Sequence, residues 1–385
     1  PNAVGGWVWG YDDGQPTPGK QAEMERGVSE ARDQGARGLS PGLFYPPGFY
    51  AQTAEVIGLA RAVARHGGIY ASHIRSESDT LLEAVAEAIG IGKRAEIRVE
   101  IAHLKLAGYR NWGGVDQLVS MLETARSSGL RLGCDQYPYH ASNSWLAAIM
   151  PYWAQAGGGK AIAERLSDPE MRARLRQDWR ENRAEWEDRG GMRHWTDIVV
   201  SDCQVRPDVL GQSIAEIAEA EGKDPLEAAF DLIVISEGLV ACVWFDQLED
   251  NVQALMRHPM VVVGSDGSAL SPQGVLGQSK SHPRSYGTFP RVLGRYVREK
   301  KVLSLEAAVK KMTSVTAARF GLTDRGVIRE GAWADLVLFD AETVGDRATF
   351  TEPHRYPAGI PYVIVNGRVV IDRGEHSGEL AGLVL

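Results

Sequence analysis

The sequence predicts an α/β protein: a (β/α) barrel of parallel strands, followed by a small β-sandwich portion at the C-terminus. Short apolar, β-branched runs alternate with stretches of helical spacing, which is typical of parallel strands joined by crossover helices. The length of 385 residues exceeds that of one compact sandwich but suits one large barrel with a satellite domain. No GxGxxG motif follows the first predicted strand, so a dinucleotide-binding open sheet has no support.

The predicted barrel elements follow one another with short connections. Residues 68–74 (GIYASHI) and 98–104 (RVEIAHL) have the apolar, β-branched composition of buried strands. Between them, residues 79–94 place Leu81, Val85 and other apolar side chains on one face, which predicts a helix. The same criteria predict strands at residues 3–9, 37–44, 130–137, 197–203, 240–245 and 260–265, and helices at residues 51–65, 116–127, 214–221 and 225–233.

Two segments depart from this alternation. Residues 142–192 are rich in Trp, Arg, Glu and Ala and predict a helical insertion on the face where barrel enzymes build active-site covers. Towards the C-terminus the period changes to two, and Asn366-Gly367 between apolar runs is a strong hairpin signal. We therefore expect a partial barrel over residues 1–325, with its insertion at about 142–192, and part of a β-sandwich over residues 326–385.

Composition excludes several classes of function. The chain has 42 Lys and Arg against 50 Asp and Glu, a net charge of −8, and no basic patch, so we expect no nucleic-acid partner. No apolar run approaches the ~18 residues that a membrane span needs. The 3 cysteines lie far apart without a CxxC pair, which excludes a disulfide scaffold and fits a reducing compartment. We therefore expect a cytoplasmic protein that acts on a small molecule.

Three polar side chains share one position, at the carboxyl end of a predicted strand. They are His73 in IYASHIRSE, His103 in EIAHLKLAG and Asp266 in VVVGSDGS. In a barrel these ends point into the active-site mouth. Imidazole and carboxylate groups are good zinc ligands, and a catalytic zinc keeps one position open for water. A lone histidine after an apolar run is more often a packed core or loop residue, so spacing alone leaves both interpretations open.

Seven segments together carry a family resemblance. Read in order, they run from about residue 20 to the end of the chain: SPGLFYPPGFYA, IYASHIRSES, AHLKLAG, CDQYPYHAS, GSDGSA, HPRSYGTFPRVLGRYVRE and GAWADLVLFDAETVGDRATF. This combination resembles the N-acyl-D-amino-acid deacylases, or D-aminoacylases, of the amidohydrolase superfamily. The resemblance implies an amidohydrolase-type metal-dependent barrel that hydrolyses the amide bond of N-acyl amino acids through a zinc-activated water.

The resemblance also implies a role for individual residues. His73 and His103 match zinc-binding histidines, and Asp266 matches the aspartate that contacts the metal or its water and transfers the proton. Lys105 and Arg284 match groups at the substrate carboxylate. Three further matches are to residues of the substrate pocket: Tyr45, Tyr137 and Ser142. The chemistry agrees, because metal lowers the pKa of bound water toward ~7 and an arginine fork suits a planar carboxylate.

Most of these residues also have an ordinary structural interpretation. Lys105 could be a solvated loop lysine, and Arg284 could cap a helix or form a structural ion pair. Tyr45 and Tyr137 flank prolines and could simply pack loops. Arg75 and Glu77 lie near His73, and we interpret them as ordinary solvent-exposed residues in preference to groups that support the site. These alternatives stay open at the level of the sequence.

The sequence departs from the family pattern at its start. The family begins with a His-x-His strand and a later Gly-Asn-Cys-Gly segment whose cysteine binds metal, and neither motif occurs in the 385 residues. The chain opens with Pro1-Asn2-Ala3 and not with methionine, and a predicted strand begins at its third residue. We therefore expect the first barrel strands to be missing and an N-terminal companion polypeptide of roughly 100–170 residues to complete barrel and sandwich. It would be a separate subunit, a cleavage product or a further part of the same chain, and would supply the remaining ligands of one or two zinc ions.

Two other functions remain compatible with the sequence. The first is a cyclic-amide or carbamoyl hydrolase on the same barrel. The second is a non-catalytic amidohydrolase-like subunit, although such a scaffold has no need of His73, His103 and Asp266 together. The residues themselves do not specify the acyl group, the amino acid, its chirality or the number of metal ions.

Overall fold

The computed structural model describes residues 6, 8, 10, 13–181 and 194–384, which form two compact units. The first unit comprises Pro1–Leu132, Tyr139–Asn251 and Ser279–Ser281, and the second comprises Gly133–Pro138, Val252–Gln278 and His282–Leu385. Most of the strand predicted at residues 3–9 lies outside the described residues. Its described members, Gly6 and Val8, are helical, so the strand prediction is wrong there. None of the described helices is long and apolar enough to cross a membrane.

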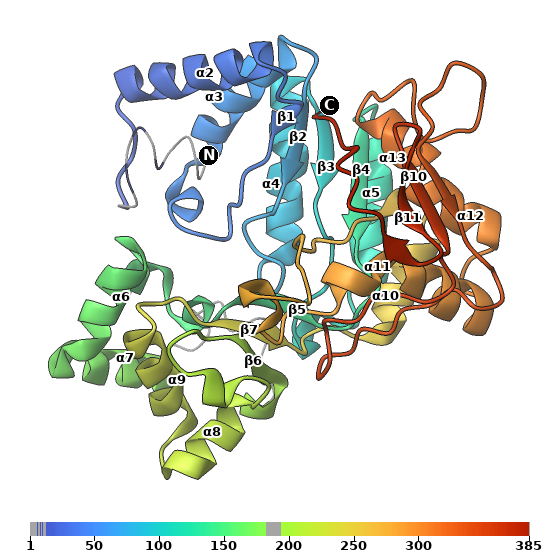
Figure 1. The fold of residues 1–385 in the computed structure, drawn as a ribbon. Helices are drawn as coiled ribbons and strands as arrows, with labels where there is room; N and C mark the ends of the chain where they lie inside the picture. The colour runs from blue at the N-terminus through green and yellow to red at the C-terminus, as the bar shows by residue number, and fades with distance from the viewer. Residues whose placement is uncertain (1–5, 7, 9, 11–12, 182–193, 385) are drawn as a thin grey trace. The chain divides into compact units, whose positions relative to one another are not determined.

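The first unit begins with parallel strands that alternate with helices (Figure 1). In chain order these elements are α2 (Pro18–Asp33), β1 (Gly38–Leu39), α3 (Thr53–Ala64), β2 (Ile69–Ser72), α4 (Leu81–Ala95), β3 (Arg98–Ile101) and α5 (Val115–Ser127). The strands β1, β2 and β3 pair in parallel, as predicted. Helix α2 begins where the Thr17 side chain accepts a hydrogen bond from the amide of Lys20, with Pro18 in the first turn.

A separate antiparallel sheet follows in the first unit and corrects two predictions. Strand β7 (Ala241–Trp244) lies between β5 (Ser142–Trp145) and β6 (Ile198–Asp202), antiparallel to both. The strands predicted at residues 197–203 and 240–245 therefore exist but do not pair as barrel strands. A short apolar run favours a buried strand without specifying its partner, so periodicity could not distinguish the two arrangements.

Helices cover this sheet and share its apolar core (Figure 1). They are α6 (Gly158–Ser167), α7 (Pro169–Glu181), α8 (Ile214–Glu221) and α9 (Pro225–Ile235). The segment predicted as a helical insertion thus begins with strand β5 before its helices, and residues 182–193 lie outside the described part of the chain. Helix α8 begins with a capping box, in which Ser213 and Glu216 exchange hydrogen bonds with each other's amides.

The second unit contains a parallel strand pair and the C-terminal antiparallel sheet. Strand β4 (Leu132–Gln136) pairs with β8 (Val261–Val263) in parallel, and the C-terminal strands follow the order β12-β11-β10-β9. The other elements here are α10 (Glu249–Arg257, at the boundary of the units), α11 (Arg284–Arg291), a π-helix (Val292–Glu299), α12 (Leu305–Met312), α13 (Ser314–Arg319), β9 (Leu336–Leu338), β10 (Tyr362–Val365), β11 (Arg368–Asp372) and β12 (Glu375–His376). The predicted hairpin is confirmed, because Asn366 (φ 49°) and Gly367 (φ 79°) both adopt the left-handed conformation between β10 and β11. The division of the chain at residue 325 stays a prediction.

Lys311 on α12 gives the second unit a testable dependence on pH. Its ammonium is buried and donates to the carbonyl oxygens of His258 and Val261. Burial, together with the charge of Arg319, lowers the pKa of Lys311 to about 8 from 10.5. Between these values the unfolded chain binds more protons than the folded chain, so the free energy of unfolding rises with pH across this window. Below about pH 8 the full cost of burying the charge is present.

We expect Lys311→Met to flatten this rise, because the variant has no group that titrates in the window. Denaturant unfolding from about pH 7 to about pH 10 gives the slope of the free energy of unfolding against pH. This slope, and not the absolute stability, is compared between the proteins. Lys310→Met, at an exposed position on the same helix, is the matched control and keeps the wild-type slope. Equal slopes for Lys311→Met and the wild type would contradict the prediction.

Candidate metal centre and its surroundings

The ends of β2 and β3 present His73 and His103 on neighbouring loops of the first unit. His73 is held by the segment after β1, because its amide donates to the Pro41 carbonyl and its carbonyl accepts from the Leu43 amide, each at 3.0 Å. The end of β3 is held beside the end of β2 by the Ala102 amide, which donates to the carbonyl of Ser72 at 2.9 Å. Parallel strands place their carboxyl ends at one edge, which explains why histidines 30 positions apart in sequence meet.

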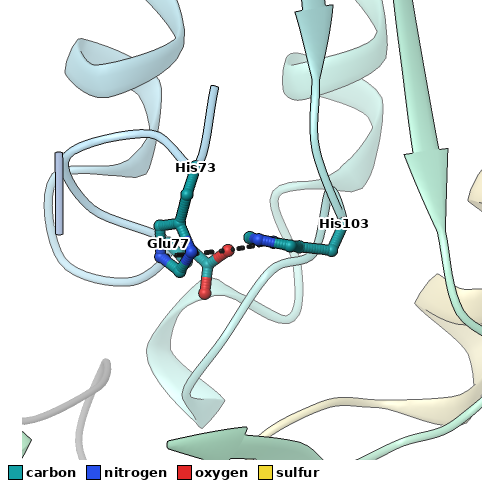
Figure 2. Close-up of side chains that lie close together, drawn as sticks. All are labelled: His73, Glu77 and His103. Carbon is teal, nitrogen blue, oxygen red and sulfur yellow. Dashed lines mark ion pairs between the residues drawn. The ribbon is translucent and has the colours of Figure 1, made fainter. Parts of the chain in front are cut away.

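The two histidines converge on a carboxylate, that of Glu77 (Figure 2). His103 Nδ1 lies 2.8 Å from Glu77 Oε1, and His73 Nε2 lies 3.7 Å from the same oxygen. The two imidazole rings are 4.4 Å apart between centroids. The potential ligand atoms of these three residues all lie within 4.8 Å of one another. Two imidazoles and a carboxylate are a donor set that zinc accepts, so the residues present fit this metal.

The interpretation of Glu77 as a surface residue is wrong. Glu77 is buried and forms an ion pair with the buried ammonium of Lys105, which therefore is not a solvated loop lysine. Burial would raise the pKa of Glu77, but the charges of Lys105, His73 and His103 hold it well below its usual range. Arg75 donates to both carboxylate oxygens of Glu87, each at 2.9 Å, and is largely covered. The sequence signal for Glu77 was that it lies in the same loop as His73. Solvated loops also carry carboxylates, so this signal could not distinguish a site residue from an exposed one.

Two of the predicted site residues have an unfavourable backbone conformation. His103 has a φ of 38° and Asp266 a φ of 46°, in the left-handed region that side chains with a Cβ rarely adopt. Such conformations persist only where the surrounding structure enforces them, and they cluster at functional sites. Both residues follow a parallel strand, β3 or β8, at the position where the sequence predicts function.

Tyr45 and Ser142 lie in the first unit, each in a defined contact. The Tyr45 ring lies 5.1 Å from the His73 ring between centroids, and its hydroxyl is 2.9 Å from the Ser144 hydroxyl. Ser142, on β5, donates to Asp246 Oδ2 at 2.6 Å. Asp246 is buried after β7, and no motif in the sequence singled it out.

The second unit brings Asp266, Arg284 and Tyr137 together. Arg284 is buried at the start of α11, and its Nη1 lies 2.9 Å from Asp266 Oδ2. Its guanidinium carbon lies 4.7 Å from the centroid of the Tyr137 ring, in a cation–π contact. His282 also was not predicted: its Nδ1 accepts from the Arg284 amide at 3.1 Å. Arg284 therefore does form an ion pair within the protein, but with the aspartate predicted to act in catalysis.

Comparison with known protein families gives a clear assignment. Residues 143–371 match the model described as the amidohydrolase family. A curated relative, an N-acyl-D-glutamate deacylase of Alcaligenes xylosoxydans xylosoxydans, is 37% identical over 363 residues, which cover 94% of this chain and 64% of the relative. The chain thus spans 64% of the length of this relative.

Solved structures agree with this match. A crystal structure of N-acyl-D-glutamate deacylase from Bordetella bronchiseptica, complexed with zinc and a phosphonate inhibitor, has a TM-score of 0.76 and 34% identity, covering 93% of this chain and 64% of that chain. A D-aminoacylase structure, described for its binuclear metal centre, also has a TM-score of 0.76, with 31% identity over 96% of this chain and 66% of that chain. The α/β class predicted from the sequence, a (β/α) barrel with a small C-terminal β portion, is confirmed by these matches.

Proposed function

Because this chain belongs to the amidohydrolase family, we propose that the protein is a zinc-dependent hydrolase that cleaves the amide bond of N-acyl-D-amino acids. One observation carries the proposal: the imidazoles of His73 and His103 converge with a carboxylate at the ends of adjacent parallel strands. The D configuration of the substrate comes from the named deacylases that the chain resembles over most of its length.

His73 and His103 would hold the zinc, with Asp266 as a further ligand. A bound zinc lowers the pKa of a water molecule and polarises the amide carbonyl. The two imidazoles fit zinc by their donor chemistry, and structures of the relatives are described with zinc or a binuclear metal centre. Any ligands beyond those of this chain, for one ion or for two, would come from the predicted N-terminal companion polypeptide.

Asp266 would move the proton. Its carboxylate would take a proton from the attacking water and return it to the leaving nitrogen, so that amide and water become a carboxylic acid and an amine. The ion pair with Arg284 holds one of its oxygens, Oδ2, at 2.9 Å. This pairing fixes the direction of the carboxylate, and its 37% exposed side chain remains accessible to water.

Arg284 and Lys105 would bind the carboxylate of the substrate. A guanidinium has five N–H donors in a rigid fork, so Arg284 can hold Asp266 through Nη1 and still offer donors to a planar anion. Lys105 would add a point charge, and its position is set by Glu77. Tyr45, Tyr137 and Ser142 would line the pocket. The companion polypeptide and the cytoplasmic location stay predictions from the sequence.

Arg284→Ala tests the substrate class. We expect the wild type to hydrolyse N-acetyl-D-amino acids in preference to the L enantiomers. In the variant the KM for these acids should rise about 10- to 100-fold, as expected for losing a hydrogen bond to a charged group. A matched amide whose carboxylate is replaced by a neutral group is the control, and its KM should not change. Equal effects on both substrates would contradict carboxylate binding and favour a cyclic-amide or carbamoyl hydrolase.

A further inference from the structure

We propose that Glu77 is a positioning residue of the metal centre, which orients the His103 imidazole toward the metal and holds Lys105 beside it, without itself being a ligand. The inference rests on the proposed function, because it concerns the same zinc site. It assigns a role to a side chain that lies between the two histidines (Figure 2) and that forms an ion pair with Lys105.

Glu77 connects the loop after β2 to the loop after β3 through both backbone and side chain. Its carbonyl accepts from the Ala107 amide at 2.9 Å, while its carboxylate contacts His103 and Lys105. The turn that follows is fixed by the Ser76 hydroxyl, which accepts from the amides two and four residues further on, at 3.2 and 3.3 Å. A carboxylate anchored in this way can impose a direction on the side chains that donate to it.

The contacts converge on a single oxygen. Glu77 Oε1 lies 2.8 Å from His103 Nδ1 and forms the ion pair with Lys105, whose Nζ lies 2.9 Å from the same Nδ1. An ammonium only donates, so an Nδ1 that donates its proton to Glu77 cannot also accept from Lys105, whose partner is then the carboxylate alone. In this tautomer the lone pair of the imidazole lies on Nε2, which is the nitrogen then suited to bind metal. Lys105 balances the charge of the buried carboxylate, which would otherwise be costly to desolvate.

The distances separate a positioning role from a ligand role. Two ligand atoms of a tetrahedral zinc site, each about 2.0–2.1 Å from the metal, lie about 3.3 Å apart. The Oε1 to Nδ1 distance of 2.8 Å is shorter and is that of a hydrogen bond. His73 Nε2, at 3.7 Å from Oε1, lies beyond hydrogen-bond distance. Glu77 thus bonds to one histidine and lies close to the other.

The experiment compares zinc binding by the complete protein carrying Glu77→Gln with that of the wild type. The amide can still accept from Nδ1 but loses the charge that holds Lys105, so we expect the Kd for zinc to rise about 10- to 100-fold while the amount bound at saturation is unchanged. In the cobalt-substituted protein, the visible bands report the ligand set and should keep their intensity. Glu77→Asp keeps the charge on a shorter side chain, which moves the carboxylate away from His103 and Lys105. We expect it also to raise the Kd for zinc.

Glu87→Gln is the matched control, since it removes another covered and ion-paired carboxylate of the first unit, and it should keep the wild-type Kd. Circular dichroism shows whether a variant is misfolded. If Glu77→Gln is misfolded, the Kd of Glu77→Asp for zinc tests the inference in its place. An unchanged Kd in a folded Glu77 variant, or lost cobalt intensity showing that a ligand is gone, would overturn the inference. A wild type that binds zinc but hydrolyses no N-acyl-D-amino acid would refute the proposed function alone, whereas a wild type without zinc affinity would refute both.

Discussion

Replacing His103 with alanine is expected to abolish tight zinc binding and to lower kcat/KM on N-acetyl-D-amino acids by about 10³-fold or more. The reason is that zinc contributes several kcal/mol of transition-state stabilisation, and each 1.4 kcal/mol corresponds to about tenfold in rate. Zinc content is measured by mass spectrometry of the purified protein, and kcat/KM by release of the free amino acid. His73→Ala should behave in the same way, because its imidazole lies on the adjacent strand end.

His66→Ala is the control for this experiment. His66 follows α3 in the same unit, is partly exposed, and lies 3.4 Å from the exposed Asp33, outside the cluster around Glu77. Its replacement should leave zinc content and kcat/KM unchanged. Alanine at position 103 also carries a Cβ, so a φ of 38° is unfavourable for it as well, and circular dichroism checks that the variant is folded. A His103→Ala protein with full zinc content would refute the assignment of His103 as a ligand.

The second large effect is expected for Asp266→Asn, which should lower kcat about 10²- to 10⁴-fold while changing KM little. The amide is nearly the same size as the carboxylate and can still accept from Arg284 Nη1, so the local structure is kept. It is a poor proton acceptor at neutral pH, and therefore the step that depends on proton transfer is lost. Steady-state kinetics with N-acetyl-D-amino acids separates kcat from KM. The assays contain saturating zinc, because an amide at position 266 is also a weaker metal ligand than the carboxylate.

Asp202→Asn is the matched control for this prediction. Asp202 also ends a strand, β6, but that strand belongs to the antiparallel sheet of the first unit. Its replacement should leave kcat unchanged. If Asp266→Asn instead kept kcat and raised KM, Asp266 would act in substrate binding, through Arg284, and not in proton transfer.

The sequence alone was sufficient where the determinants are local. Apolar runs bounded by polar residues predicted the strands β2 and β3 and their polar ends at His73 and His103, because strand length and strand termination depend on neighbouring residues. The hairpin at Asn366-Gly367 follows from the left-handed conformation that those two residues tolerate. The combination of motifs also identified the family, which the comparisons confirm.

Only the tertiary structure decided features that depend on contacts between distant segments. Strands β6 and β7 have the composition of barrel strands, but β7 pairs in the antiparallel direction with both β6 and β5, since an apolar run does not encode its partner. Glu77 is a polar residue of a polar loop in the sequence. It becomes a buried carboxylate because Lys105, 28 positions later, supplies the compensating charge. Burial and charge pairing are properties of the folded chain, and for this reason the place of Glu77 in the site could not be predicted from residue type and spacing.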